Sequence, residues 1–111
     1  MTPKIYRWLP AWSPFDGLAL FGMVIARKTA SQRLIDHELV HLRQQKEDGW
    51  LRYALRYTFS PHWRVVYEAE GYAAQVRGGA DIKFCATALS GWRYLWPCSY
   101  DVAIEAIRSR V

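Results

Sequence analysis

The stretch SQRLIDHELVHLRQQKEDG, residues 31–49, contains the strongest indication of the fold. Leucine, isoleucine and valine residues surround its central motif, as in a helix that buries one face. Thr29 and Gln32 resemble a capping box at its start, and Ser31 is an alternative cap. Gly49 is a typical helix stop. We therefore expect a helix from about residue 30 to Asp48.

The centre of this helix reads His37-Glu38-Leu39-Val40-His41, an HExxH motif. Two residues four apart lie about 40° apart around a helix, so both imidazoles can bind one metal ion. Glu38 lies beside that face, where it can hold a water molecule on the metal. Two ligands, one base and an open coordination position are what a zinc peptidase needs. The alternative is two surface histidines and a solvated glutamate.

Outward from the motif, the sequence predicts an α+β fold that is mostly helical, in one domain of 111 residues. Residues 1–17 are rich in Pro and Trp and are expected to be irregular, whereas Leu18–Arg27 is expected to be a strand. Further helices are expected in four later segments: Trp50–Phe59, Pro61–Arg77, residues 80–92, and a last one capped by Ser99 and reaching about Arg108.

Two histidines need a third protein ligand to complete a zinc site. The metzincin pattern fails, because Gln44 and Glu47 stand where it places glycine and a third histidine. The next long helix offers Glu68 and Glu70, which lie about 200° apart around it, so only one can face the histidines. Glu68 borders the apolar face, whereas Glu70 lies nearer Arg77 and suits a surface ion pair. We expect Glu68 to be the ligand; Glu70, or neither, is the alternative.

HELVH followed by Glu68-Ala-Glu-Gly-Tyr72 resembles the gluzincin zinc metallopeptidases, and the chain length resembles their small single-domain members, the minigluzincins. The resemblance implies a zincin-like domain with one Zn²⁺ held by His37, His41 and Glu68. It also implies that the strand before the motif is an edge strand that pairs with extended peptide substrates. The chain departs from the family at Tyr72, where many gluzincins have an aspartate that supports the metal site.

The activity that this resemblance implies is hydrolysis of peptide bonds, with Glu38 as the general base. Gln44, one turn after His41, is a candidate to support a metal ligand from outside the ligand group. An oxyanion donor is also needed. The candidates for that donor are Tyr72, Tyr67, Tyr100 and His62. The alternative functions are a non-catalytic binding module stabilised by zinc, and a basic helical domain that binds nucleic acid.

Composition and charge are weak evidence for the binding partners and the cellular location of the protein. The net charge is +5, but the arginines are scattered, so contact with nucleic acid is not expected. The segment Leu51–Tyr57, with Arg52 and Arg56, could contact a membrane surface or a nucleic-acid backbone. The alternative is that it packs its aromatic residues on the core while its arginines face solvent. The longest apolar run, Leu18–Ala26, is too short to span a bilayer. Prolines and Asp16 before it disfavour a signal peptide, so a cytoplasmic location is expected.

Overall fold

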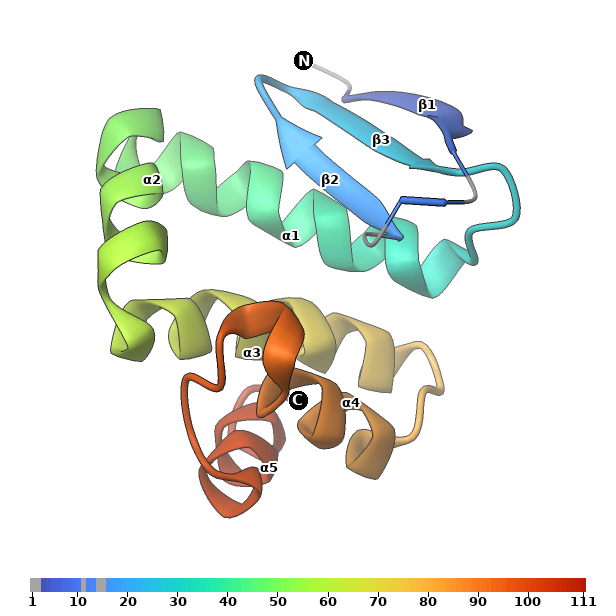
Figure 1. Cartoon of the computed structure of the whole chain (residues 1–111). Helices are drawn as coiled ribbons and strands as arrows, with labels where there is room; N and C mark the ends of the chain where they lie inside the picture. The colour runs from blue at the N-terminus through green and yellow to red at the C-terminus, as the bar shows by residue number, and fades with distance from the viewer. Residues whose placement is uncertain (1–2, 11, 14–15) are drawn as a thin grey trace.

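The computed structural model describes residues 3–10, 12–13 and 16–111, and it has the predicted α+β, mostly helical fold (Figure 1). Three strands come first in the chain, and the helices follow. The strands are β1 (Lys4–Leu9), β2 (Gly17–Leu20) and β3 (Met23–Arg27). The helices are α1 (Gln32–Asp48), α2 (Trp50–Phe59), α3 (Pro61–Arg77), α4 (Ile82–Leu89), the 3₁₀ helix η1 (Trp92–Tyr94) and α5 (Tyr100–Arg108).

The sheet has the order β1-β3-β2, and it differs from the prediction in two ways. The predicted strand Leu18–Arg27 is extended as expected but is two strands, β2 and β3, because Phe21 and Gly22 turn the chain back with φ of 49° and 77°. Positive φ at both central residues is typical of a tight hairpin turn. The prediction that residues 1–17 are irregular is wrong at β1, which pairs in parallel with β3. Residues 1–2, 11 and 14–15 of that segment lie outside the described residues.

Serine caps fix the starts of three helices. The hydroxyl of Ser31 accepts a hydrogen bond from the amide of Leu34, so Ser31 rather than the Thr29–Gln32 capping box begins α1. Ser60 and Ser99 cap α3 and α5 in the same way, as the sequence predicts. The helix predicted over residues 80–92 is shorter than expected, because it ends at Leu89 and gives way to η1.

Two apolar clusters lie on either side of the α1–α3 contact. One joins the sheet to the upper face of α1 and is formed by Val24, Ala26, Ile35 and Leu42. The other joins α3, α4 and α5, and its buried members include Val65, Ala69, Ala73, Leu89 and Ile107. Helix α1 lies between the sheet and α3, and it packs on both (Figure 1). The HExxH face of α1 therefore meets α3 between the two clusters. Among the described residues, no helix is both long and apolar enough to cross a membrane.

Candidate metal centre

His37, His41 and Glu68 form a compact buried group where α1 meets α3. The Nε2 atoms of both histidines lie 2.8 Å from the same oxygen of Glu68, Oε1. One ligand atom from each residue lies within 4.8 Å of the others, so the group could hold one metal ion. Glu70 is the surface glutamate of the pair, but its partner is Arg43 rather than the predicted Arg77. The structure thus brings Glu68, and not Glu70, to the two histidines.

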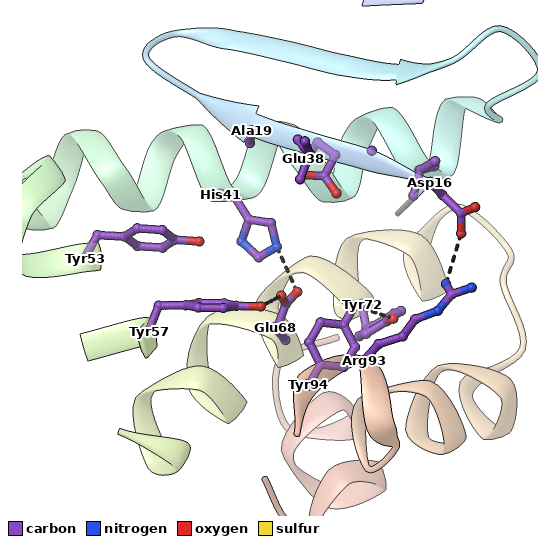
Figure 2. Close-up of a pocket in the computed structure, with 13 residues that line it drawn as sticks. Asp16, Ala19, Glu38, His41, Tyr53, Tyr57, Glu68, Tyr72, Arg93 and Tyr94 are labelled. Atoms are coloured by element: carbon purple, nitrogen blue, oxygen red, sulfur yellow. Dashed lines mark hydrogen bonds and ion pairs between the residues drawn. The ribbon is translucent and has the colours of Figure 1, made fainter. Parts of the chain in front are cut away.

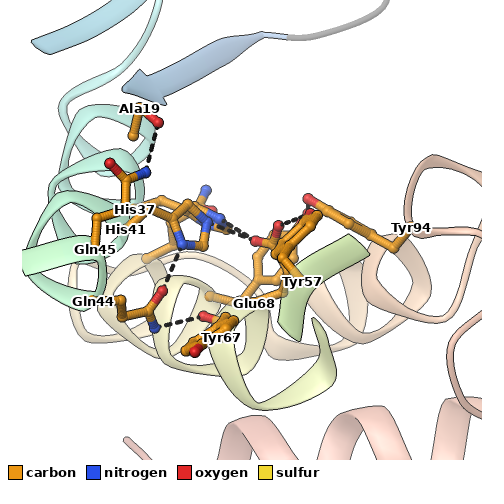
Figure 3. A network of polar contacts seen from close by, with 11 residues as sticks. Ala19, His37, His41, Gln44, Gln45, Tyr57, Tyr67, Glu68 and Tyr94 are labelled. Carbon is orange, nitrogen blue, oxygen red and sulfur yellow. Dashed lines mark hydrogen bonds and ion pairs between the residues drawn. The ribbon is translucent and has the colours of Figure 1, made fainter. Parts of the chain in front are cut away.

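Each histidine has a glutamine beside its other ring nitrogen, and Figure 3 shows the one next to His41, Gln44. Nδ1 of His37 lies 2.6 Å from Oε1 of Gln75, and Nδ1 of His41 lies 2.9 Å from Oε1 of Gln44. The Gln44 amide nitrogen donates in turn to the Tyr67 carbonyl, which fixes its oxygen toward the ring. Because an amide oxygen only accepts, each Nδ1 carries a proton, so Nε2 is the ring nitrogen whose lone pair could bind a metal once any proton there has left.

The predicted contact of Gln44 with the site is therefore confirmed, whereas Gln75 was missed as a site residue. Gln75 follows Glu68 by two helical turns, so the two side chains share one face of α3. That spacing is the feature of the sequence that could have identified Gln75 as a neighbour of the site.

A third helix, α2, contributes Tyr57 to the centre. Its hydroxyl donates to Oε2 of Glu68 at 2.6 Å, so the two oxygens of this carboxylate have separate partners. Burial and the nearby Glu68 charge raise the pKa of Tyr57, and the hydroxyl stays protonated as a donor. No pattern in the sequence points to this contact, because Tyr57 lies in an aromatic and basic segment that also fits a surface helix.

A buried arginine positions Tyr57 and Tyr94. The guanidinium of Arg64 donates to the carbonyls of Tyr57 (2.9 Å) and Thr58 (2.8 Å) at the end of α2, and to that of Tyr94 (3.2 Å) at the end of η1. These carbonyls are left without helical partners at helix C-termini, so a buried cation satisfies them well. Arg64 thereby joins the two segments whose tyrosines face the site.

The histidines and Glu68 shift one another's pKa values toward the charged forms. Burial alone would raise the pKa of Glu68, but the two histidines outweigh it and hold that pKa well below its ordinary value. Burial likewise lowers the pKa of His41, yet the Glu68 carboxylate overcomes this and raises it to about 9. Without a metal, His41 therefore holds a proton at neutral pH. A metal ion must displace that proton, so metal binding strengthens as the pH rises toward 9.

Glu38 is buried but does not join the ligand group. Its carboxylate has no hydrogen-bond partner among the described residues, and it faces the pocket above His41 (Figure 2). Burial raises its pKa, while the nearby histidines lower it by less. A Cβ atom on Gly17 of β2 would lie 3.2 Å from Cγ of Glu38, so the glycine leaves room for this side chain. Glu38 is thus a base of raised pKa that is open to bound molecules.

The pocket beside the centre has a volume of about 320 Å³. Its described walls come from β2, α1, α2, α3 and η1, and they include Leu18, Tyr53, Tyr57, Arg93 and Tyr94. Tyr72 also lines it, and its hydroxyl lies 2.8 Å from that of Tyr94. The other predicted oxyanion donors, Tyr67, Tyr100 and His62, do not line it; the hydroxyl of Tyr67 donates to Asp48 instead. Tyr72 is thus the one predicted donor at the pocket, and Tyr94 is a donor that the sequence did not indicate.

The imidazole of His37 packs directly against Gly71 of α3. A Cβ atom there would lie 2.7 Å from Nε2 of His37, closer than side chains tolerate. We expect Gly71→Ala to push the imidazole aside and to weaken metal binding by at least about tenfold, the scale of losing a supporting contact. Alanine favours the helix, so a loss of fold is not expected.

Gly78→Ala is the matched control, because the nearest atom to its new methyl group would belong to the flexible Arg33 side chain, at 3.3 Å, and the next are carbonyl oxygens at 3.4 and 3.6 Å rather than a ligand ring. Isothermal titration with zinc checks the comparison. Equal affinities for the Gly71→Ala and Gly78→Ala proteins would contradict the close contact with His37.

Comparison of this chain with protein-family models, with curated proteins and with solved structures finds no match.

Proposed function

We propose that this protein is a zinc-dependent peptidase of the gluzincin type. The observation that carries the proposal is the position of Glu38. It lies next to a buried His-His-Glu group and opens into the pocket, while its neighbours His37 and His41 turn toward Glu68. A site that only stabilises a fold has no use for an unpaired, partly desolvated carboxylate at this place.

Zinc is the metal that this donor set suits best. Two neutral imidazoles and one carboxylate, each with an outer hydrogen-bond partner, are the ligands of catalytic zinc sites that keep a fourth position open. Zinc bound by His37, His41 and Glu68 would polarise a substrate carbonyl and lower the pKa of a coordinated water toward about 7. The hydrogen bond from Tyr57 to Oε2 of Glu68 leaves Oε1 directed at the histidines.

The roles of the remaining residues follow from their places around the pocket. Glu38 orients the attacking water, takes its proton and delivers that proton to the leaving amine. Tyr72 and Tyr94 share a hydrogen bond at the opposite wall, so either hydroxyl can donate to the developing oxyanion. Burial raises the pKa of both tyrosines, which keeps the two hydroxyls protonated and able to donate.

Strand β2 is the element that would align a substrate. It is an edge strand of the sheet, and it lines the pocket from Gly17 to Ala19; β3, which directly precedes the HExxH helix, is the central strand. The hydrogen bond from the Arg27 amide to the Asp16 carbonyl sets the register, so the backbone groups of Gly17 and Ala19 point away from β3. The Ala19 carbonyl already accepts a hydrogen bond from the side-chain amide of Gln45. We infer that an extended peptide pairs with β2 at Gly17.

Metal-dependent hydrolysis tests this proposal. We expect the purified protein to cleave a pool of unstructured peptides, to lose cleavage when a chelator removes the metal, and to regain it when zinc is returned in stoichiometric amount. Full activity of the metal-free protein would contradict the proposal. Full zinc occupancy without hydrolysis of any peptide in the pool would instead favour a non-catalytic module stabilised by zinc.

A further inference from the structure

The outward face of α2 is apolar, which is unusual for a surface helix. Leu51, Leu55 and Phe59 are 62%, 50% and 76% exposed, and they follow one another at intervals of four residues along one side. None of the ten residues of α2 is buried. The tyrosines of α2, Tyr53 and Tyr57, lie on the inner side of the helix, where they line the pocket. Helices of soluble proteins normally have the opposite arrangement, with leucines inward and polar groups outward.

Exposed aromatic rings also lie at the start of the helix. The ring of Trp50, at the start of α2, stacks on that of Phe21 at the tip of the β2–β3 hairpin, with centroids 5.4 Å apart. Both rings are at least half exposed. The hairpin tip and α2 lie on the same side of the molecule (Figure 1). Phe21, Trp50, Leu51, Leu55 and Phe59 together form what we call the α2 ridge.

The charges around the α2 ridge are positive. Helix α2 contains Arg52 and Arg56 and no acidic residue. Arg52 is exposed in its first turn, and Lys46 is exposed in the last turn of α1; neither has an ion-pair partner among the described residues. The nearby acidic residues are already paired, Glu47 with Arg43 and Asp48 with Arg56.

We propose that the α2 ridge docks on the surface of a lipid bilayer that contains anionic lipids, with α2 lying in the plane of the interface. Leucine and phenylalanine side chains on one helix face enter the boundary between head groups and acyl chains, and tryptophan prefers the head-group level. Free cations beside such a face bind the head groups of anionic lipids. This inference does not depend on zinc or on peptidase activity.

The charge pattern favours a bilayer over a second copy of the chain. A symmetric dimer through the α2 ridge would bring Arg52 and Lys46 of one copy toward the same cations of the other, which like-charge repulsion disfavours. An anionic membrane offers the opposite charge. Tyr53 and Tyr57 lie on the inner side of α2, so docking through the ridge leaves the pocket walls in place.

Co-sedimentation with lipid vesicles tests the proposal on the full chain. Wild-type protein should bind vesicles that contain phosphatidylglycerol at least about tenfold more tightly than vesicles of phosphatidylcholine alone, and added salt should weaken that binding. Leu55→Ser with Phe59→Ser should reduce binding to the anionic vesicles at least about tenfold, because both side chains lose their apolar contact with lipid. Arg52→Gln should reduce it by a smaller factor.

Phe84→Ser is the matched control, since Phe84 of α4 is 71% exposed but lies outside the α2 ridge; its binding should equal that of wild type. Circular dichroism should show every variant folded, because the altered side chains face solvent. Absence of binding by wild type, or equal binding by the double variant, would overturn the proposal. A wild-type dimer that the double variant converts to monomer would overturn it in favour of self-association.

Discussion

Glu38→Gln is expected to leave zinc bound and to lower peptide hydrolysis by at least about 100-fold, the scale of losing a general base. Glutamine keeps the size of the side chain and most of its hydrogen bonding, but it cannot accept the proton of the attacking water. Zinc affinity should hardly change, because Glu38 is outside the ligand group of His37, His41 and Glu68. Initial rates on one cleaved peptide, at saturating zinc, give the comparison.

Glu47→Gln is a suitable control for this variant. Glu47 lies on the same helix, but it is exposed and paired with Arg43, so the same chemical change there should leave the rate unaltered. A Glu38→Gln protein that hydrolyses peptide at the wild-type rate would show that this HExxH motif is not the catalytic site.

Glu68→Ala should weaken zinc binding by at least about 100-fold, whereas Glu70→Ala should change it little. Loss of an outer partner of a metal ligand costs 10- to 100-fold in affinity, and loss of the ligand itself should cost at least as much. Glu70 is on the surface, where its ion pair with Arg43 contributes at most about 1 kcal/mol to stability. Competition between the protein and a chromogenic chelator measures both affinities. The reverse pattern would reassign the third ligand to Glu70.

Local signals predicted most of the helices. Ser60-Pro61 and Ser99 begin α3 and α5 as expected, and Gly49 separates α1 from α2, because caps and stops act through neighbouring backbone groups. The choice of Glu68 over Glu70 also followed from helix geometry alone, since the apolar side of α3 must face the core.

The sheet was harder to predict, because its signals were ambiguous or distant. The turn at Phe21-Gly22 lies inside a continuous apolar run, where one glycine is weak evidence for a hairpin. Strand β1 is mostly exposed and gains its partner, β3, from a segment about twenty residues later. Pairing over that distance depends on tertiary packing, which local propensity does not report.

The surroundings of the metal centre depend on tertiary contacts in the same way. Tyr57 reaches Glu68 from the end of α2, which the buried Arg64 joins to η1 through hydrogen bonds to both segments. Tyr94 faces the pocket because η1 interrupts the helix that the sequence predicts there. Gln75 is the exception, since its spacing from Glu68 places both on one face of α3.

The metal content of the purified protein tests the assigned metal site directly. It is measured by elemental mass spectrometry in wild type and in the double variant His37→Ala, His41→Ala. One three-ligand site predicts about one zinc per chain in wild type and none in the double variant. Both proteins should be dialysed against the same zinc buffer and shown by circular dichroism to be folded. Zinc retained at full occupancy by the folded double variant would contradict the assignment of the site to α1 and α3.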